Sequence, residues 1–227
     1  MNKDFYTIRM NTEPENIGVS NGIKQANIKK EGFSNQHDYN ELMRLLGSRE
    51  YWENRHLINS MRFNVECIEL LPKAILTDFL LFGPVLINCE YAISERVVEI
   101  LRRFHIHKGS WFPASVIDQR AISHPYWVIH LETMDDSVID FSKSLFYTGW
   151  NPEEKNLIRF ENIREKEDFS KTSILKIHSL SFNDSFDDSI DMFTIKNHGE
   201  TIISERLKRE LTASRATGPI YMPAWAS

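Results

Sequence analysis

Short segments in which apolar and polar residues alternate constrain the fold of this chain more than any other feature. Such alternation predicts half-buried strands, and it occurs in residues 63–70, 173–180 and 190–195. Apolar runs of strand length occupy residues 74–82, 84–88, 114–118 and 126–131, the last one after a break at Pro125. Helices interrupt these strands without a regular βαβ rhythm. We therefore expect an α+β fold with mixed or antiparallel sheets and a few short helices.

Three segments have the apolar spacing of short amphipathic helices. Residues 38–46 place three leucines on one face, and Gly47 follows as a stop signal. Residues 94–104 form the clearest helix, with Ser94 in the position of an N-cap. Residues 204–211 have a narrower apolar stripe, so we expect a weaker helix there.

Two of these helices belong to an internal similarity at an offset of 110 residues. Residues 93–114 align without gaps with residues 203–224, and both begin with Ile-Ser-Glu-Arg. In each copy a strand leads to a serine, a short helix follows, and an aromatic strand ends at a proline. Two copies are too few for a solenoid. The similarity instead suggests two related strand–helix–strand units, around residues 84–118 and 190–227.

The N-terminal part of the chain differs in character from the rest. Residues 11–36 are polar and show little periodicity, which predicts a loop or a loosely attached arm. We therefore separate an N-terminal region, residues 1–60, from an α+β domain, residues 61–227. The sequence leaves open whether residues 11–36 are ordered only when a partner binds.

The charge of the chain is unevenly distributed. The formal net charge is −5, which disfavours a general nucleic-acid binder. Residues 131–200 carry 15 acidic and 8 basic side chains, whereas residues 1–130 are neutral. An acidic, loop-borne surface can steer association with a basic protein, although polar loops are also simply solvated. The candidate partner-binding residues are Asp135, Asp136, Asp140, Asp184, Asp187, Asp188 and Asp191.

No motif in the sequence specifies catalysis, a cofactor or a metal. The glycine-rich phosphate loops and the nucleophile elbow are absent. The aspartates at 184–191 lack the glycine and the final glutamate of an EF-hand loop. His105 and His107 lie beside basic residues, which favours an exposed turn over a metal site. We expect no catalytic residue, no cofactor and no metal.

The sequence also indicates where the protein acts. Residues 1–10 lack the apolar core of a signal peptide. The most apolar window, residues 70–89, is interrupted by charges and prolines, so it predicts core strands instead of a membrane span. Cys67 and Cys89 are expected to be reduced and buried. We therefore expect a cytoplasmic protein with no membrane contact.

Residues 202–223 resemble the closing segment of a family of bacterial immunity proteins. In that family, which was named for a myxobacterial member and is found beside polymorphic toxins, a hydrophobic strand leads to Ser-Glu-Arg-Leu-Lys. An amphipathic helix and a Thr-Gly strand ending near a proline follow. The matching residues here are 204–208, Leu211, Thr217-Gly218 and Pro223. Residues 126–135, 142–144 and 190–195 also resemble the family, so the likeness runs from about Leu86 to the C-terminus.

The resemblance implies a function without catalysis. Such a protein binds a cognate toxin in the cytoplasm and occludes its active site. The acidic region would suit a basic toxin, such as a nuclease, whose own substrate is a polyanion. Two alternatives remain: an enzyme in which His130, His178 and carboxylates converge in a cleft, and an adaptor of a secretion or phage-like apparatus. The sequence also leaves open whether the chain forms a homodimer.

Overall fold

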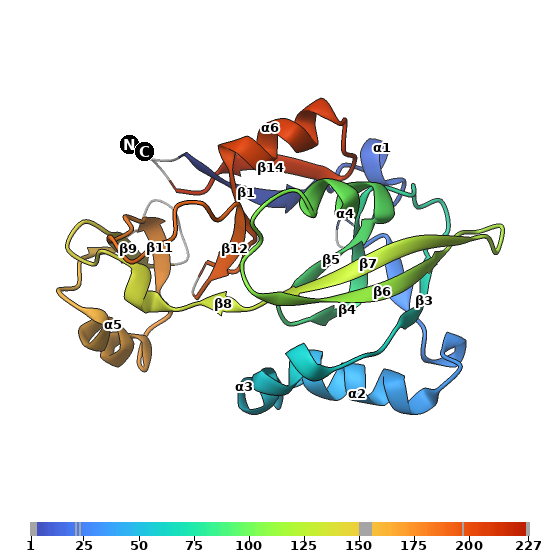
Figure 1. The fold of residues 1–227 in the computed structure, drawn as a ribbon, viewed down its shortest axis with the longest axis horizontal. Helices are drawn as coiled ribbons and strands as arrows, with labels where there is room; N and C mark the ends of the chain where they lie inside the picture. The colour runs from blue at the N-terminus through green and yellow to red at the C-terminus, as the bar shows by residue number, and fades with distance from the viewer. Residues whose placement is uncertain (1–3, 21, 23, 150–155, 197, 226–227) are drawn as a thin grey trace.

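The computed structural model describes residues 4–20, 22, 24–149, 156–196 and 198–225, whose strands form a barrel and two further sheets (Figure 1). The α+β fold with mixed and antiparallel sheets and a few short helices is confirmed. Phe63 and Phe112 stack in the barrel core, with 4.5 Å between ring centroids. The barrel closes through six strands in the order β2 (Ala26–Ile28), β3 (Val65–Leu70), β6 (Gly109–Ile117), β7 (Ser123–Leu131), β5 (Cys89–Ser94) and β4 (Phe79–Leu86).

Short helices from the N-terminal part of the chain cover the barrel. Leu42, Leu46 and Tyr51 are buried in the same cluster as the barrel interior, and Figure 1 shows their helices beside the barrel strands. The predicted helix at 38–46 is thereby confirmed. The covering elements are α1 (Pro14–Ile17), η1 (Lys30–Gly32), α2 (Gln36–Leu46), α3 (Tyr51–Asn54) and η2 (Arg55–Ser60).

The prediction of a loosely attached arm at residues 11–36 is wrong for the described residues, which exclude 21 and 23. Although this segment is mostly polar, it contains a few isolated apolar side chains. Ile17, Val19, Ile28 and Phe33 are all buried in the barrel core. In addition, β2 pairs with both β3 and β4, so this segment supplies one strand of the barrel wall.

Five strands form an open sheet beside the barrel. They follow the order β14 (Pro219–Pro223), β1 (Phe5–Met10), β13 (Ile202–Ser204), β12 (Met192–Ile195) and β8 (Thr133–Met134). Residues 1–60 are thus not a separate body in the structure. Their first strand lies in the open sheet between β13 and β14, and the remainder belongs to the barrel and its cover.

Two helices fill the space between the barrel wall and the open sheet. They are α4 (Glu95–Leu101) and α6 (Glu205–Ala213), which contact each other. Val97, Leu101, Leu207 and Leu211 share one buried cluster with side chains from β5, β7, β1 and β13. Phe104, which ends the predicted helix 94–104, lies beyond the end of α4 and is only partly buried. This cluster therefore joins the barrel to the open sheet.

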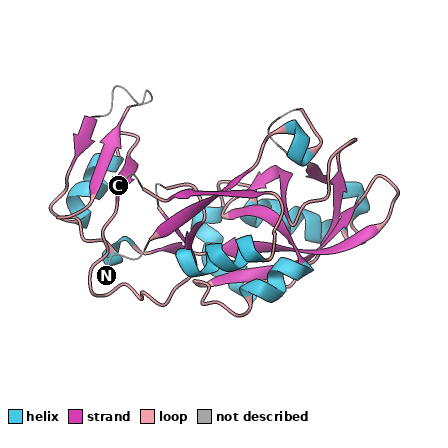
Figure 2. Ribbon diagram, turned by 90° about the horizontal axis from the view of Figure 1, so that it is seen from above, coloured by secondary structure: helices cyan, strands magenta, loops and turns pink. Residues whose placement is uncertain are grey.

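A small lobe projects at one end of the molecule, as Figure 2 shows, and it packs on the face of the open sheet opposite to α4 and α6. We define it as the described residues of 135–190. Its sheet has the order β10 (Asn156–Ile158), β9 (Leu145–Thr148) and β11 (Lys176–Ser179), and it also holds η3 (Asp136–Val138) and α5 (Ile163–Ser170). Phe5 and Phe193 of the open sheet pack against Phe182 and Phe186 of the lobe. Much of the acidic segment 131–200 therefore folds into this lobe.

The internal similarity corresponds to a repeated strand arrangement. In the first copy Ile93 of β5 and Pro113 of β6 both pair with Trp127 of the antiparallel strand β7. In the second copy Ile203 and Pro223 both pair with Tyr6 of β1. The register is the same in both copies. The central strand differs only in its place in the chain: β7 follows its helix, whereas β1 comes from the N-terminus.

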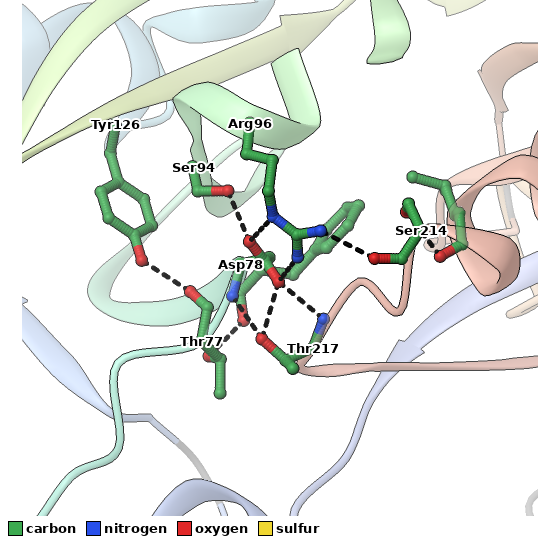
Figure 3. Close-up of polar contacts among 9 residues, drawn as sticks. Thr77, Asp78, Ser94, Arg96, Tyr126, Ser214 and Thr217 are labelled. Carbon is green, nitrogen blue, oxygen red and sulfur yellow. Dashed lines mark hydrogen bonds and ion pairs between the residues drawn. The ribbon is translucent and has the colours of Figure 1, made fainter. Parts of the chain in front are cut away.

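In each copy, an aspartate from an earlier part of the chain binds the serine and the arginine of Ile-Ser-Glu-Arg, and Figure 3 shows the first of the two, Asp78. Asp78 accepts from Ser94 Oγ at 2.8 Å and from Arg96 Nε at 3.2 Å. Asp191 accepts from Ser204 Oγ at 2.6 Å and from the Arg206 guanidinium. Ser204 also caps α6, whereas the Ser94 hydroxyl does not cap α4. We call these two groups the aspartate nodes.

The two aspartate nodes are linked reciprocally. The segment after α6 reaches the first node, where the Thr217 amide donates to Asp78 Oδ2 at 2.8 Å. The segment after α4 reaches the second node, where the His105 amide donates to Asp191 Oδ2 at 3.0 Å. Figure 3 also shows Arg96 donating to the carbonyl oxygen of Ser214, at 2.7 Å. Each repeat thus supplies a backbone hydrogen bond to the aspartate node of the other.

Two predicted breaks lie inside strands. Pro125 is part of β7 and pairs with Ser115 of β6. It is tolerated because β5 pairs with β7 only from residue 126 onward, so the missing N–H faces no partner strand. The runs 74–82 and 84–88 likewise contribute to one strand, β4, which covers residues 79–86 of them and passes through a cis Gly83–Pro84 bond.

Candidate functional site

Most of the predicted acidic residues lie on two neighbouring loops of the small lobe. Asp135, Asp184, Asp187 and Asp188 are exposed, and Asp140 is half-buried. The loops lie side by side because Asn183 donates to the carbonyl oxygen of Ser137 at 2.7 Å, and Ile139 forms a bridge with Phe182. Structure therefore brings together acidic residues that are separated by more than 40 positions in the sequence.

Local hydrogen bonds keep two of these carboxylates charged. The Lys143 ammonium and the Ser142 hydroxyl hold the pKa of Asp140 down at about 2. The Ser137 hydroxyl and amide lower the pKa of Asp135. Both groups remain ionised at neutral and mildly acidic pH, so they contribute negative charge to this surface.

Asp191 is not part of the surface, which corrects its place among the candidate residues. Its side chain is fully buried in the second aspartate node. Burial opposes its ionisation, but Arg206 and Ser204 bind the carboxylate and keep its pKa below the usual range. Because its carboxylate is buried and bound by these partners, Asp191 has a structural role.

Asp136 is likewise withdrawn from the open surface. Its Oδ2 accepts from Lys166 Nζ at 2.5 Å, and the Lys166 side chain is only 1 % exposed. The two residues join η3 to α5 inside the lobe. Asp136 therefore does not offer an exposed charge to a partner, but it forms part of the wall of a cleft.

This cleft lies where the helical cover of the barrel meets the small lobe. Its volume is about 520 Å³, within the range of ligand-binding pockets. Four carboxylates and two basic side chains line it, together with polar and aromatic groups. The lining residues are Tyr51, Arg55, His56, Asn59, His130, Glu132, Thr133, Met134, Asp135, Asp136, Ile163, Glu167 and Lys196.

His130 stands in the wall of the cleft with one ring nitrogen unpartnered. Asn88 donates to the Tyr51 hydroxyl oxygen at 2.9 Å, and the same hydroxyl lies within hydrogen-bond distance, 3.1 Å, of His130 Nε2. The other ring nitrogen of His130 is Nδ1. This Nδ1 is buried and has no hydrogen-bond partner among the described residues, and the same is true of Asp136 Oδ1.

Burial should make the stability of the protein depend on pH through His130. It lowers the pKa of His130 from 6.5 to about 4, against a small opposing effect of Glu132. Between these values the unfolded chain binds a proton that the folded chain does not, so stability falls as pH decreases from 6.5 towards 4. We expect His130 to account for a loss of about 2 kcal/mol at pH 4.5.

Urea unfolding at pH 7.5 and pH 4.5 measures this loss. The variant His130→Gln keeps an acceptor for Tyr51 but does not titrate, so its stability should fall by about 2 kcal/mol less. Equal losses in the two proteins would show that His130 is not responsible.

Neither His178 nor His105 lines this cleft, whose other histidine is His56. His178 lies on β11 and contacts the ring of Tyr147, so the predicted convergence with His130 does not occur. His105 Nδ1 lies 2.8 Å from the Ser189 hydroxyl. Ser189 belongs to the loop that carries Asp184, Asp187 and Asp188, which we call the acidic loop. Among the residues that the structure describes, no three His, Cys, Asp or Glu side chains are grouped as a metal site requires. Cys67 and Cys89 are free and buried, as predicted.

Comparison with known proteins does not assign the chain to a family. No family model matches it, and no curated protein is significantly similar in sequence. Separately, none of the helices in the described part of the chain has the length and apolar character needed to cross a membrane.

Proposed function

We propose that this protein is a cytoplasmic immunity protein that binds a basic toxin and occludes its active site. The observation that carries the proposal is the concentration of negative charge in one projecting part of the fold. Residues 131–200 have a net charge of −7, and the small lobe that they largely form presents acidic loops and adjoins a carboxylate-lined cleft. A surface of this kind accelerates association with a positively charged partner.

The residues that resemble the immunity family support the same proposal. Residues 202–223 form a strand, a helix capped by Ser204, and a strand that ends at Pro223. This is the succession of elements that the resemblance implies. The last strand is held firmly, since Thr217 binds Asp78 through both its amide and its hydroxyl.

The chemistry of His130 favours binding over catalysis. A general base works best when its pKa lies near the working pH, whereas burial lowers the pKa of His130 to about 4. Its Nε2 is also engaged by the Tyr51 hydroxyl. An enzyme that used His130 as its base would have to disrupt this contact.

Co-expression with the toxin encoded by the neighbouring gene tests the proposal. We expect this chain to restore growth of cells that produce the toxin, and the purified proteins to form a complex at micromolar concentrations. Failure to rescue growth, together with the absence of a complex, would refute the proposed function.

Charge reversal on the acidic loop should slow complex formation. In the triple variant Asp184→Lys/Asp187→Lys/Asp188→Lys we expect the association rate constant to fall by about tenfold at 20 mM salt and much less at 500 mM, because salt screens exposed charges. Stopped-flow mixing measures both rates. The matched control is Glu13→Lys/Glu15→Lys/Glu31→Lys, which changes the net charge equally at exposed sites in the N-terminal part. An equal effect of the two triple variants would remove the acidic loop from the interface.

A further inference from the structure

Two neighbouring strands of the open sheet present large apolar side chains to solvent. In the second repeat Met222 of β14 pairs with Thr7 of β1, and Ile220 pairs with Arg9. Residues that pair directly point to the same side of a sheet, so these four side chains share one face. We call them the β1–β14 face. Met222 is 41 % exposed and Ile220 is 42 % exposed, although they are adjacent on this face.

The equivalent face of the first repeat is covered by another part of the chain. At the offset of 110 residues, Met222 corresponds to Phe112 and Ile220 corresponds to Ser110. Phe63, which precedes β3, stacks on Phe112, and the Ser110 hydroxyl donates to a side-chain oxygen of η2 at 2.8 Å. Phe112 is consequently buried. The described residues of the second repeat give Met222 and Ile220 no such cover.

The edge of β14 is poorly suited to the addition of a further strand. β14 is the outermost strand of the open sheet, and the Asn11 amide donates to the carbonyl oxygen of Gly218 at 2.8 Å. Because bonded positions alternate in an antiparallel pair, the backbone positions that point away from β1 are Pro219, Tyr221 and Pro223. Two of these have no N–H. A partner would therefore pack on the face of β14 instead of extending the sheet.

The acidic loop lies beside this face, which indicates the charge of the partner. Phe5 and Thr7 point to the same side of β1, because they are two residues apart in one strand. The ring of Phe5 meets that of Phe186, which belongs to the acidic loop, with 6.0 Å between centroids. Exposed carboxylates thus border an exposed apolar surface. An apolar centre with a polar rim is the usual composition of a protein interface.

We infer that the β1–β14 face is the apolar centre of the partner-binding surface and receives an aromatic side chain from a basic segment of the toxin. The segment is basic because the neighbouring loop is acidic. It contributes an aromatic side chain because Phe63 occupies the equivalent place in the first repeat. Arg9 does not oppose a basic partner, since Glu200 pairs with it at 2.7 Å. The inference rests on the proposed binding of a basic toxin and specifies the surface that the toxin contacts.

Measuring affinity for the toxin in two double variants tests the inference. Ile220→Ala/Met222→Ala removes most of the apolar surface of the face, and we expect it to weaken binding by at least about tenfold. Ile75→Ala/Ile122→Ala is the matched control, because these isoleucines have a similar exposure but lie outside the open sheet and the small lobe. The control should change affinity by less than about twofold.

The outcomes separate this inference from the proposed function. Equal effects of the two double variants would exclude the β1–β14 face from the interface while leaving the immunity function intact. If the unmodified chain does not bind the toxin, the proposed function fails, and the inference that rests on it fails as well.

Rate measurements distinguish the apolar centre from its charged rim. We expect Ile220→Ala/Met222→Ala to raise the dissociation rate constant by about tenfold at both 20 mM and 500 mM salt, because salt does not screen apolar contacts. The charge reversal on the acidic loop instead slows association, and mainly at low salt. An effect of the apolar variant on the association rate alone would contradict the assigned role.

Sedimentation of the free chain tests whether a second molecule of this protein covers the face instead. We expect the unmodified chain and Ile220→Ala/Met222→Ala both to be monomers at micromolar concentrations. A dimer of the unmodified chain that the double variant does not form would assign the face to self-association and overturn the inference.

Discussion

Replacing Lys166 with methionine is expected to lower the free energy of unfolding by about 3–5 kcal/mol. The ammonium of Lys166 is the only partner that the described residues give to the Asp136 carboxylate, since Oδ1 is unpartnered. Both side chains are almost completely buried. Without Lys166 the carboxylate would remain in the interior with its charge uncompensated. Urea unfolding at pH 7 measures the difference.

Two further variants separate loss of the buried pair from loss of the lysine alone. Lys171→Met removes an exposed lysine on the C-terminal side of the same helix, where it pairs with exposed Asp168, and should cost less than about 1 kcal/mol. Asp136→Asn combined with Lys166→Met removes both charges and should recover much of the stability that the single substitution loses. If Lys166→Met costs no more than Lys171→Met, the pair is not a buried ion pair in solution.

Removing the carboxylate from either aspartate node should cost about 3 kcal/mol. Asp191→Ala would leave the buried Ser204 hydroxyl and the His105 amide without their acceptor. Asp78→Ala would do the same to Ser94 and to Thr217. Because the two nodes make equivalent bonds, we expect the two losses to be similar.

Chemical denaturation of the two variants tests this equivalence. Asp184→Ala is the matched control, since it removes an exposed aspartate and should change stability by less than about 0.5 kcal/mol. A node variant that behaves like the control would show that its hydrogen bonds contribute little to the folded state.

Much of the architecture could be predicted from local sequence patterns. Alternation, apolar runs and helical spacing placed the strands β3, β4, β6, β7, β11 and β12 and the helices at 38–46, 94–104 and 204–211, because each of these elements buries apolar side chains. The central strand of the second repeat was missed. Residues 5–10 (Phe-Tyr-Thr-Ile-Arg-Met) correspond in register to residues 126–131 (Tyr-Trp-Val-Ile-His-Leu), but they lie far from the unit that they complete. Only the pairing partners reveal this relationship.

The site was less predictable because burial depends on partners that are distant in sequence. Exposed loop aspartates such as Asp184 and Asp188 have the surface positions that their polar surroundings indicate. Asp136 has equally polar neighbours in the sequence, but it is buried together with Lys166, its ion-pair partner 30 residues later. Asp191 alternates with apolar Ile190 and Met192, a pattern that predicts a solvent-facing side chain. It is buried because Ser204 and Arg206, which come later in the sequence, bind its carboxylate. The cleft combines residues from the barrel cover, β7, η3 and α5, so no local pattern could predict it.

The reciprocal aspartate nodes have a consequence for how the protein loses its structure. In each repeat, the segment that follows the helix donates a backbone hydrogen bond to the aspartate of the other repeat. The exchange resembles that of the arms in a domain-swapped dimer, but here both repeats belong to one chain. If one repeat unfolds, the aspartate of the other repeat loses a backbone hydrogen-bond donor. We therefore expect the two repeats to unfold in a single cooperative transition, with no species in which one remains intact.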